Sequence, residues 1–97
     1  MLIHKIPDIF QSKIRLAIIA SLISGEKSFN EIKVLTKATD GNLSVHLTKL
    51  EQLEYINSTK LFVGRKPKTT YNITDKGRLE FVNYVRLLER ILQDTPS

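Results

Sequence analysis

Residues 39–50 read TDGNLSVHLTKL. Leu43, Leu47 and Leu50 recur at intervals of four and three, which is the spacing that aligns side chains on one face of an α-helix. An Asp-Gly pair favours a β-hairpin only between alternating strands, and here both flanks have a helical pattern. The stretch therefore predicts a helix over about residues 41–54 whose leucines face the core.

A shorter helix is predicted directly before this one. Ser28 and Glu31 have the spacing of a capping box, which indicates a helix over about residues 29–37. Asp40 or Thr39 is expected to cap the second helix. The inward residues of the shorter helix are expected to be Phe29, Ile32 and Leu35. A turn of about three residues joins the pair, as in a helix-turn-helix.

Upstream, a helical pattern runs from Asp8 or Ser12 to Ser24, and Gly25 is placed to end it. Its apolar residues fall on more than one side, so the helix must be buried on more than one side. A central core helix would explain this pattern. A core helix that also meets a second subunit would explain it equally well.

The segments YINSTKLFV (55–63) and KTTYNIT (68–74) favour strands by their β-branched and aromatic content. Gly64-Arg65-Lys66-Pro67 supplies the turn between them, and Pro67 is expected to keep the strands from pairing through that point. Residues 55–74 are therefore predicted to form a β-hairpin.

Thr74 is expected to cap a last helix over about residues 75–92. The apolar arc of this helix is wider than the one face that a terminal lid would need. That surplus favours pairing with a partner helix over a simple lid with a few exposed apolar side chains.

Composition limits the classes of protein to consider. The 97 residues suit a single domain, residues 1–97, and 15 Lys and Arg against 10 Asp and Glu give a net charge of +5, which favours polyanionic partners. The absence of cysteine excludes disulfides and thiolate metal sites. The longest uncharged stretch, residues 16–25, is about half the roughly 20 residues of a membrane-spanning helix. An intracellular, cytoplasmic protein is expected.

Catalytic chemistry has no support in the sequence. His4 and His46 are far apart, and neither has a neighbour at metal-ligand spacing. No Gly-rich phosphate loop or nucleophile elbow is present. We therefore expect no enzymatic activity, no cofactor and no metal, and we expect His46 to be a partly buried imidazole bonded to a neighbour.

The outer face of the 41–54 helix points to DNA instead. If the three leucines face inward, a turn of about 100° per residue directs six other residues outward. These are Gly41, Ser44, Val45, Thr48, Lys49 and Gln52. Hydroxyl groups, a methyl-bearing side chain and a lysine permit close approach to a major groove and contact base edges or phosphates there. Asn42 lies to the side, near the helix start.

The hairpin adds a basic surface. Residues 55–74 include four basic side chains and no acidic one, a pattern that suits phosphate contact. The basic residues are Lys60, Arg65, Lys66 and Lys68. The full set of predicted DNA-contacting residues is Asn42, Ser44, Val45, Thr48, Lys49, Arg65, Lys66 and Lys68.

Taken together, these segments resemble a known family. FNEIKVLTKATDGNLSVHLTKLEQLEYI (29–56) and GRKPKTTYNITDKGR (64–78), with weaker support from RLAII (15–19), resemble the winged-helix transcriptional regulators of the MarR and ArsR type. The similarity is greatest to their small single-domain members. The fold class is accordingly mainly α with a small β-hairpin, a winged helix-turn-helix.

The resemblance implies a prokaryotic homodimer that binds double-stranded DNA sequence-specifically and controls transcription, with the N- and C-terminal helices forming the dimer interface. It places Ser44, Val45, Thr48 and Lys49 in the major groove, and Arg65 and Lys66 at the wing tip. Metal sensing of the ArsR kind is not carried over, and no polar cluster marks a site for a small-molecule effector. The alternative is a winged-helix adaptor that binds proteins without reading DNA.

One position departs from the family pattern. The family usually ends the recognition helix with Gly where this chain has Glu54. A left-handed conformation there would cost Glu roughly 1 kcal/mol relative to Gly. We therefore expect the helix to end in a different way.

Overall fold

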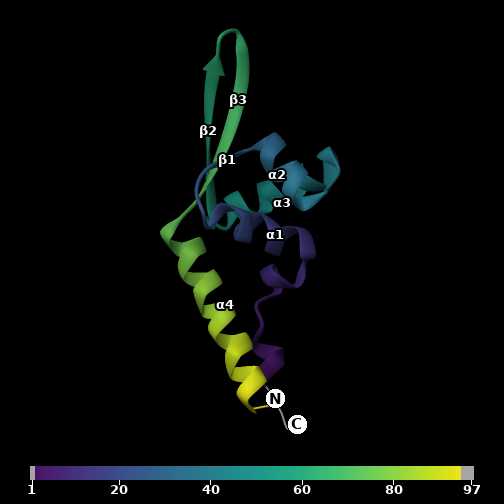
Figure 1. The fold of residues 1–97 in the computed structure, drawn as a ribbon, viewed down its shortest axis with the longest axis vertical. Coiled ribbons are helices and arrows are strands. Elements are labelled where there is room, and N and C mark those ends of the chain that lie inside the picture. Colours follow the sequence, from purple (N-terminus) through teal and green to yellow (C-terminus); the bar gives the residue numbers. More distant parts are fainter. Residues whose placement is uncertain (1, 95–97) are drawn as a thin grey trace.

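Three short helices lie in the middle of the molecule, between a projecting β-hairpin and a long C-terminal helix (Figure 1). The structure is a computed structural model that describes residues 2–94. Its elements are η1 (Leu2–Lys5), η2 (Asp8–Gln11), α1 (Lys13–Leu22), β1 (Lys27–Ser28), α2 (Phe29–Thr36), α3 (Asp40–Gln52), β2 (Ile56–Val63), β3 (Lys66–Ile73) and α4 (Asp75–Asp94). The hairpin and α4 extend in opposite directions and give a body of 58 × 26 × 21 Å.

The core is centred on α1. Ile18, Ile19 and Leu22 have no exposed surface and pack with buried residues of α2 and α3. No large apolar side chain of α1 is exposed, as a central core helix requires, and contact of α1 with a second subunit stays a prediction. The helix begins later than Asp8, because Ser12 caps it by accepting a hydrogen bond from the Arg15 N–H at 3.2 Å.

The short helix α2 confirms the predicted capping box. The Ser28 side chain accepts from the Glu31 N–H at 3.2 Å, and the Glu31 carboxylate accepts from the Ser28 N–H at 3.1 Å. Ile32 is buried and Phe29 is half-buried, but the expectation for Leu35 is wrong, because that side chain is 57% exposed. Steps of three residues drift by about 60° around a helix, so Leu35 has already turned out of the buried face.

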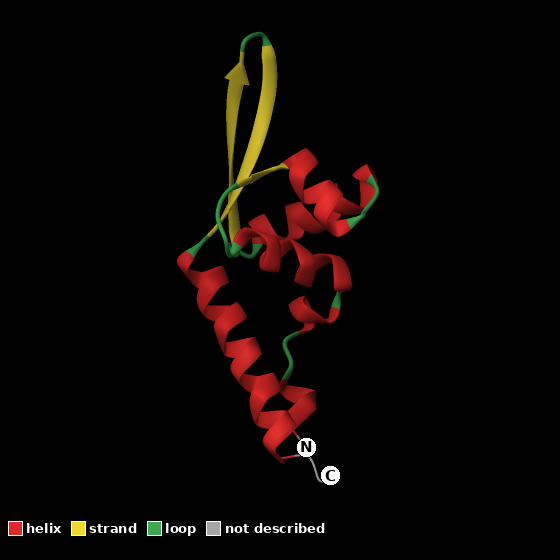
Figure 2. Ribbon diagram, in the orientation of Figure 1, coloured by secondary structure: helices red, strands yellow, loops and turns green. Residues whose placement is uncertain are grey.

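The sheet has three antiparallel strands in the order β1-β3-β2 (Figure 2). The sequence predicted only the two hairpin strands and missed β1, which consists of two residues paired with β3. The expectation that Pro67 blocks pairing is wrong, since Pro67 lies opposite Phe62 within the ladder. Pairing with β1 reaches β3 only at Thr70 and Tyr71, so the other edge of β3 is open at Pro67, where a residue without an N–H is tolerated.

Helix α3 ends in a Schellman motif. The Tyr55 N–H donates to the Leu50 carbonyl at 3.0 Å, and the Glu54 N–H donates to the Glu51 carbonyl at 2.9 Å. Glu54 itself has a φ of 62°. The expectation of a different helix end is therefore wrong: Glu54 adopts the left-handed conformation that usually belongs to glycine. Burial of Leu50 and Tyr55 across the motif offsets the local cost.

Replacing Glu54 by glycine is expected to stabilise the protein by about 1 kcal/mol, because the left-handed conformation no longer carries a Cβ penalty. Equilibrium urea unfolding followed by circular dichroism measures this change. Glu54→Ala is the matched control, since it removes the same charge from the helix C-terminus but retains the Cβ. Equal gains in both variants would show that the charge, and not the backbone conformation, is what costs stability.

The long helix α4 is fixed to the body at its N-terminus and along its first half. The Thr74 hydroxyl accepts from the Gly77 N–H at 3.0 Å, which confirms Thr74 as the predicted cap. The same hydroxyl donates to the Glu54 carbonyl at 2.6 Å. Further along, Tyr84 stacks on Phe10 of η2 with ring centroids 4.6 Å apart. These contacts direct α4 away from the hairpin.

Candidate nucleic-acid interface

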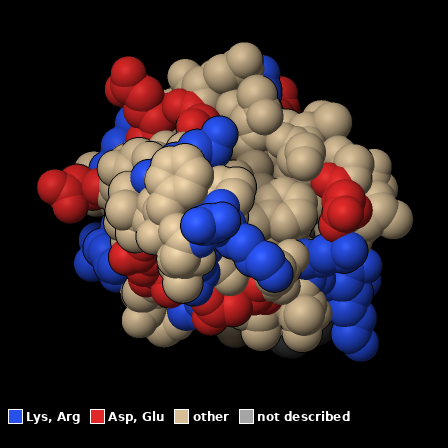
Figure 3. Space-filling view, turned by 90° about the horizontal axis from the view of Figure 1, so that it is seen from above, with Lys and Arg blue, Asp and Glu red and all other residues tan. Residues whose placement is uncertain are grey.

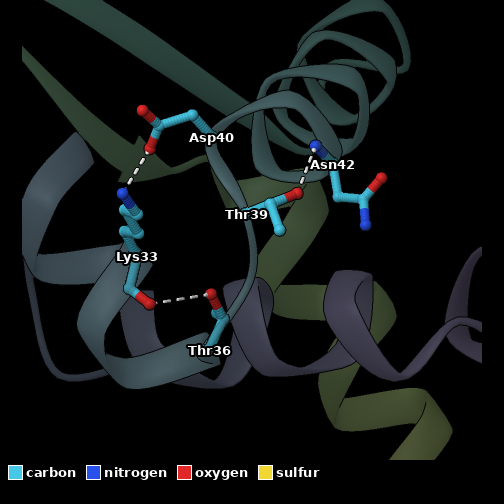
Figure 4. Close-up of polar contacts among 5 residues, drawn as sticks. All are labelled: Lys33, Thr36, Thr39, Asp40 and Asn42. Carbon is cyan, nitrogen blue, oxygen red and sulfur yellow. Dashed lines mark hydrogen bonds and ion pairs between the residues drawn. The ribbon is translucent and has the colours of Figure 1, made fainter.

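The turn between α2 and α3 sets the position of α3 (Figure 4). The Asn42 N–H donates to the Thr39 hydroxyl at 3.2 Å, so the expectation that Asp40 caps the helix is wrong and the alternative, Thr39, is the cap. Asp40 instead forms an ion pair with Lys33 of α2 at 2.7 Å. The Thr36 hydroxyl donates to the Lys33 carbonyl at 3.5 Å. The ion pair joins the end of α2 to the start of α3.

The outer face of α3 is exposed as predicted. Its leucines, Leu43, Leu47 and Leu50, are all buried in the core. A shallow depression of about 420 Å³ lies on the opposite side. It is lined by Ser44, Val45, Thr48, Lys49 and Gln52. Val45 is 67% exposed, and Asn42 is exposed near the helix start with its side chain directed away from the cap. The predicted α3 residues therefore share one accessible surface.

His46 lies between this surface and the core, where the sequence placed it. Its ring is partly buried, and its Nδ1 atom is 3.5 Å from an Arg15 nitrogen. Burial, together with the Arg15 charge, lowers the pKa of His46 below its ordinary value. Arg15 also donates to the Ile9 carbonyl at 2.9 Å and to the Asp8 carbonyl at 3.1 Å. The guanidinium thus connects α3 to the N-terminal segment, a role that the sequence did not suggest.

The hairpin of β2 and β3 (Ile56–Val63 and Lys66–Ile73), hereafter the wing, carries the second group of predicted residues. Arg65 lies in its two-residue turn, and Lys66 and Lys68 lie on β3; all three are exposed. Figure 3 views the molecule from the side on which the wing projects and shows Lys and Arg side chains beside uncharged ones. At the base of the wing the Ser58 hydroxyl donates to a Glu51 carboxylate oxygen at 3.3 Å, which ties the wing to α3.

Within residues 2–94 no group of three or more His, Asp or Glu side chains is arranged to hold a metal ion. None of the helices described is both long and apolar enough to cross a membrane. The exposed face of α3 and the basic wing are therefore the features from which a function can be argued.

Comparison with known proteins agrees with this geometry. Residues 14–92 match the family model for a winged helix DNA-binding domain. An uncharacterized protein of Methanocaldococcus jannaschii, MJ0432, is 41% identical over 78 residues, which cover 79% of this chain and 85% of that protein. The match to the family model includes α3 and the whole wing.

Solved structures share the fold. A transcriptional regulator homologue of Pyrococcus horikoshii superposes with a TM-score of 0.86 at 26% identity, covering 95% of this chain and 94% of that one. A MarR-family regulator of Enterococcus faecalis superposes with a TM-score of 0.77 at 19% identity, covering 90% and 79%. PadR of Bacillus subtilis, in complex with operator DNA, superposes with a TM-score of 0.66 at 27% identity over 75% of this chain and 45% of PadR.

These findings confirm the predicted winged-helix fold and the resemblance to MarR-type regulators. The family model spans most of the chain, including every predicted contact residue on α3 and the wing. The chain belongs to the winged helix DNA-binding domain family.

Proposed function

We propose that this protein is a homodimeric transcriptional regulator that binds double-stranded DNA sequence-specifically. The proposal treats residues 1–97 as a single domain, of which Met1 and residues 95–97 lie outside the described range. The observation that carries it is the outer face of α3, where small, hydrogen-bonding and basic side chains are exposed together and no acidic one lines the surface. Such a face is narrow enough to enter a major groove.

The residues of the face other than Gln52, and Asn42 beside them, each have a role in this proposal. Ser44 and Thr48 donate hydrogen bonds to base edges or phosphates, and Val45 contacts a thymine methyl group. Lys49 neutralises a phosphate or donates to guanine. Asn42, beside the helix N-terminus, contacts a base or the backbone.

The wing supplies the backbone contacts. Arg65, Lys66 and Lys68 project from a hairpin that contains no acidic residue, so the wing attracts phosphates next to the groove that α3 occupies. PadR, which has a related fold, binds its operator DNA. That complex supports the same kind of partner for this chain.

The second subunit is inferred from α4. Besides the residues that pack on the body, α4 exposes Val82, Val85, Leu88 and Leu92, which are between 36% and 79% accessible. At about 100° per residue these four occupy roughly a third of the helix circumference. Ile3 of η1, which packs beside α4, is also exposed. An apolar face of this size on a projecting helix suits a partner helix from a second copy.

A duplex-binding measurement tests the proposal. Sequences selected from random duplexes should contain two half-sites about 34 Å apart, one for each α3 of the dimer. Affinity for such a duplex, measured by fluorescence anisotropy, should fall by about 1,000-fold between roughly 50 and 200 mM salt, because the basic side chains release counterions. Mass measurement in solution should give a dimer.

Two results would overturn the proposal. The first is the absence of affinity for any duplex at low salt. The second is salt-insensitive capture of a protein without duplex binding, as the adaptor alternative requires. Only Val45 is apolar on the outer face of α3, which argues against an adaptor surface there.

A further inference from the structure

The wing has an apolar tip that neither the core nor the expected phosphate contacts explain. Leu61, Phe62 and Val63 are three consecutive large apolar residues, exposed by 50%, 73% and 63%. None of them belongs to the core or to the half-buried residues packed against it. The two eight-residue strands carry them away from the helices (Figure 1). Folding alone therefore gives no reason for apolar side chains at this position.

The register of the hairpin divides this tip between two faces. Phe62 pairs with Pro67, so a ring and a pyrrolidine lie side by side on one face. Leu61 and Val63 point to the other face. On that face each lies beside its cross-strand partner, Lys68 for Leu61 and Lys66 for Val63. The tip is therefore a thin apolar wedge with a large planar side chain on one face and basic side chains interleaved on the other.

The charge around the wedge indicates its partner. Lys60, Arg65, Lys66 and Lys68 surround the apolar residues, and residues 55–74 contain no acid. A partner that fits must offer negative charge beside an apolar interior. A DNA groove does so, because phosphates line both sides of a stack of bases.

The position of the wing relative to α3 makes the same partner reachable. Ser58 at the base of β2 is hydrogen-bonded to Glu51 of α3, so the wing lies next to whatever α3 binds. An eight-residue strand spans about 26 Å. The neighbouring minor groove is about 17 Å along the duplex from the major groove, which is half a helical turn. The tip can therefore reach the minor groove while α3 occupies the major groove.

We propose that the wing tip inserts Phe62 between base pairs in the minor groove and kinks the bound DNA. Apolar wedges inserted in this way unstack a base step and bend the duplex towards the major groove. The basic side chains around the tip hold the phosphates on either side. This inference rests on the proposed DNA-binding function and adds to it a deformation of the operator, so sequence preference extends to flexible base steps under the wing.

Bending of an end-labelled, selected duplex, measured by fluorescence energy transfer, tests the inference. Wild-type protein should raise the transfer efficiency. Phe62→Ala should lose at least half of that increase, whereas affinity should fall only about 3- to 10-fold, because the lost stacking is partly offset by unstacking that no longer occurs. Leu35→Ala, which removes an exposed apolar side chain from α2, is the matched control and should bend the duplex as the wild type does.

A second variant reports on insertion directly. The chain contains no tryptophan, so Phe62→Trp places a single tryptophan at the wedge. Its emission should be quenched when the selected duplex is added, whereas that of Leu35→Trp should not change.

Three results would contradict these expectations. If Phe62→Ala bends the duplex as much as the wild type does, and the emission of Phe62→Trp does not change on adding duplex, the inference is overturned and the DNA-binding function stays intact. A response of Phe62→Trp to anionic vesicles but not to duplex would also overturn it, in favour of a membrane surface. Loss of duplex binding by every protein, wild type included, would instead refute the proposed function.

Discussion

Val45→Glu is expected to reduce affinity for the selected duplex by at least about 100-fold without destabilising the fold. In the proposed complex Val45 faces the major groove, so a carboxylate there meets the negative potential of the DNA, once in each subunit. The new carboxylate also lies four residues before Lys49, which is the spacing of a helical ion pair. It would therefore neutralise the Lys49 ammonium group, a second contact with the DNA. A single lost base contact costs about 1–3 kcal/mol, and two subunits double the loss. Anisotropy titration at fixed salt measures the effect.

Two controls separate a lost interface from a damaged protein. Val34→Glu makes the same change at a 76% exposed valine of α2 and should retain most of the affinity. Val45→Thr keeps a methyl group at the same site and should bind within about tenfold of the wild type. Both positions are exposed, so unfolding free energies should stay within about 0.5 kcal/mol of the wild type. Equal loss of binding by Val34→Glu and Val45→Glu would show that net charge, rather than the face of α3, determines affinity.

The parts of the fold that repeat a local pattern were predictable from the sequence. The leucine spacing of α3 identified its buried face, because each of those residues must turn towards the core. The capping box at Ser28 located the start of α2 to the residue. The basic, acid-free character of the wing was visible without any structure. These features depend only on residues close together in the chain.

Two of the errors came from positions where distant contacts decide the outcome. The two-residue strand β1 has no periodicity of its own and exists because β3 pairs with it. Glu54 tolerates a left-handed conformation because Leu50 and Tyr55 are buried on either side of the motif. In these two cases tertiary packing outweighs a local preference. Leu35 is a different kind of error, because it lies six residues after Phe29, about 120° around the helix, and so leaves the face that Ile32 buries.

The exposure of the predicted α3 and wing residues could be inferred from the sequence, but the arrangement of the wing tip could not. Strand content alone did not show that Leu61, Phe62 and Val63 remain exposed, because the same composition is typical of a buried strand. Only the length of the wing and its attachment to α3 place them beyond the core. The contact between Glu51 and Ser58 is likewise a product of the fold, since the two residues belong to different elements.

Gly77→Ala is expected to lower the free energy of unfolding by about 3 kcal/mol or more, although alanine is the better helix former by about 1 kcal/mol. A Cβ at Gly77 would overlap the Tyr55 carbonyl oxygen and lie 3.0 Å from the Ile73 side chain. The Tyr55 carbonyl is not free to move aside, because it accepts from the Thr74 N–H at 3.0 Å and shares the Thr74 hydroxyl proton with the Glu54 carbonyl. Urea unfolding at one protein concentration measures the loss, and the concentration is fixed because dimer stability depends on it.

Gly41→Ala is the matched control, since a Cβ at Gly41, also within a helix, would meet nothing within 4 Å. The free energy of unfolding of that variant should rise by up to about 1 kcal/mol because alanine has the higher helix propensity. The two glycine replacements should therefore change the free energy of unfolding in opposite directions. A Gly77→Ala protein as stable as the wild type would mean that α4 shifts away from Tyr55 at little cost. Because α4 also carries the proposed dimer face, such a shift should weaken dimerisation while the fold remains stable. If α4 cannot shift, Gly77→Ala should instead unfold the protein, and dimerisation and duplex binding should be lost together with the fold.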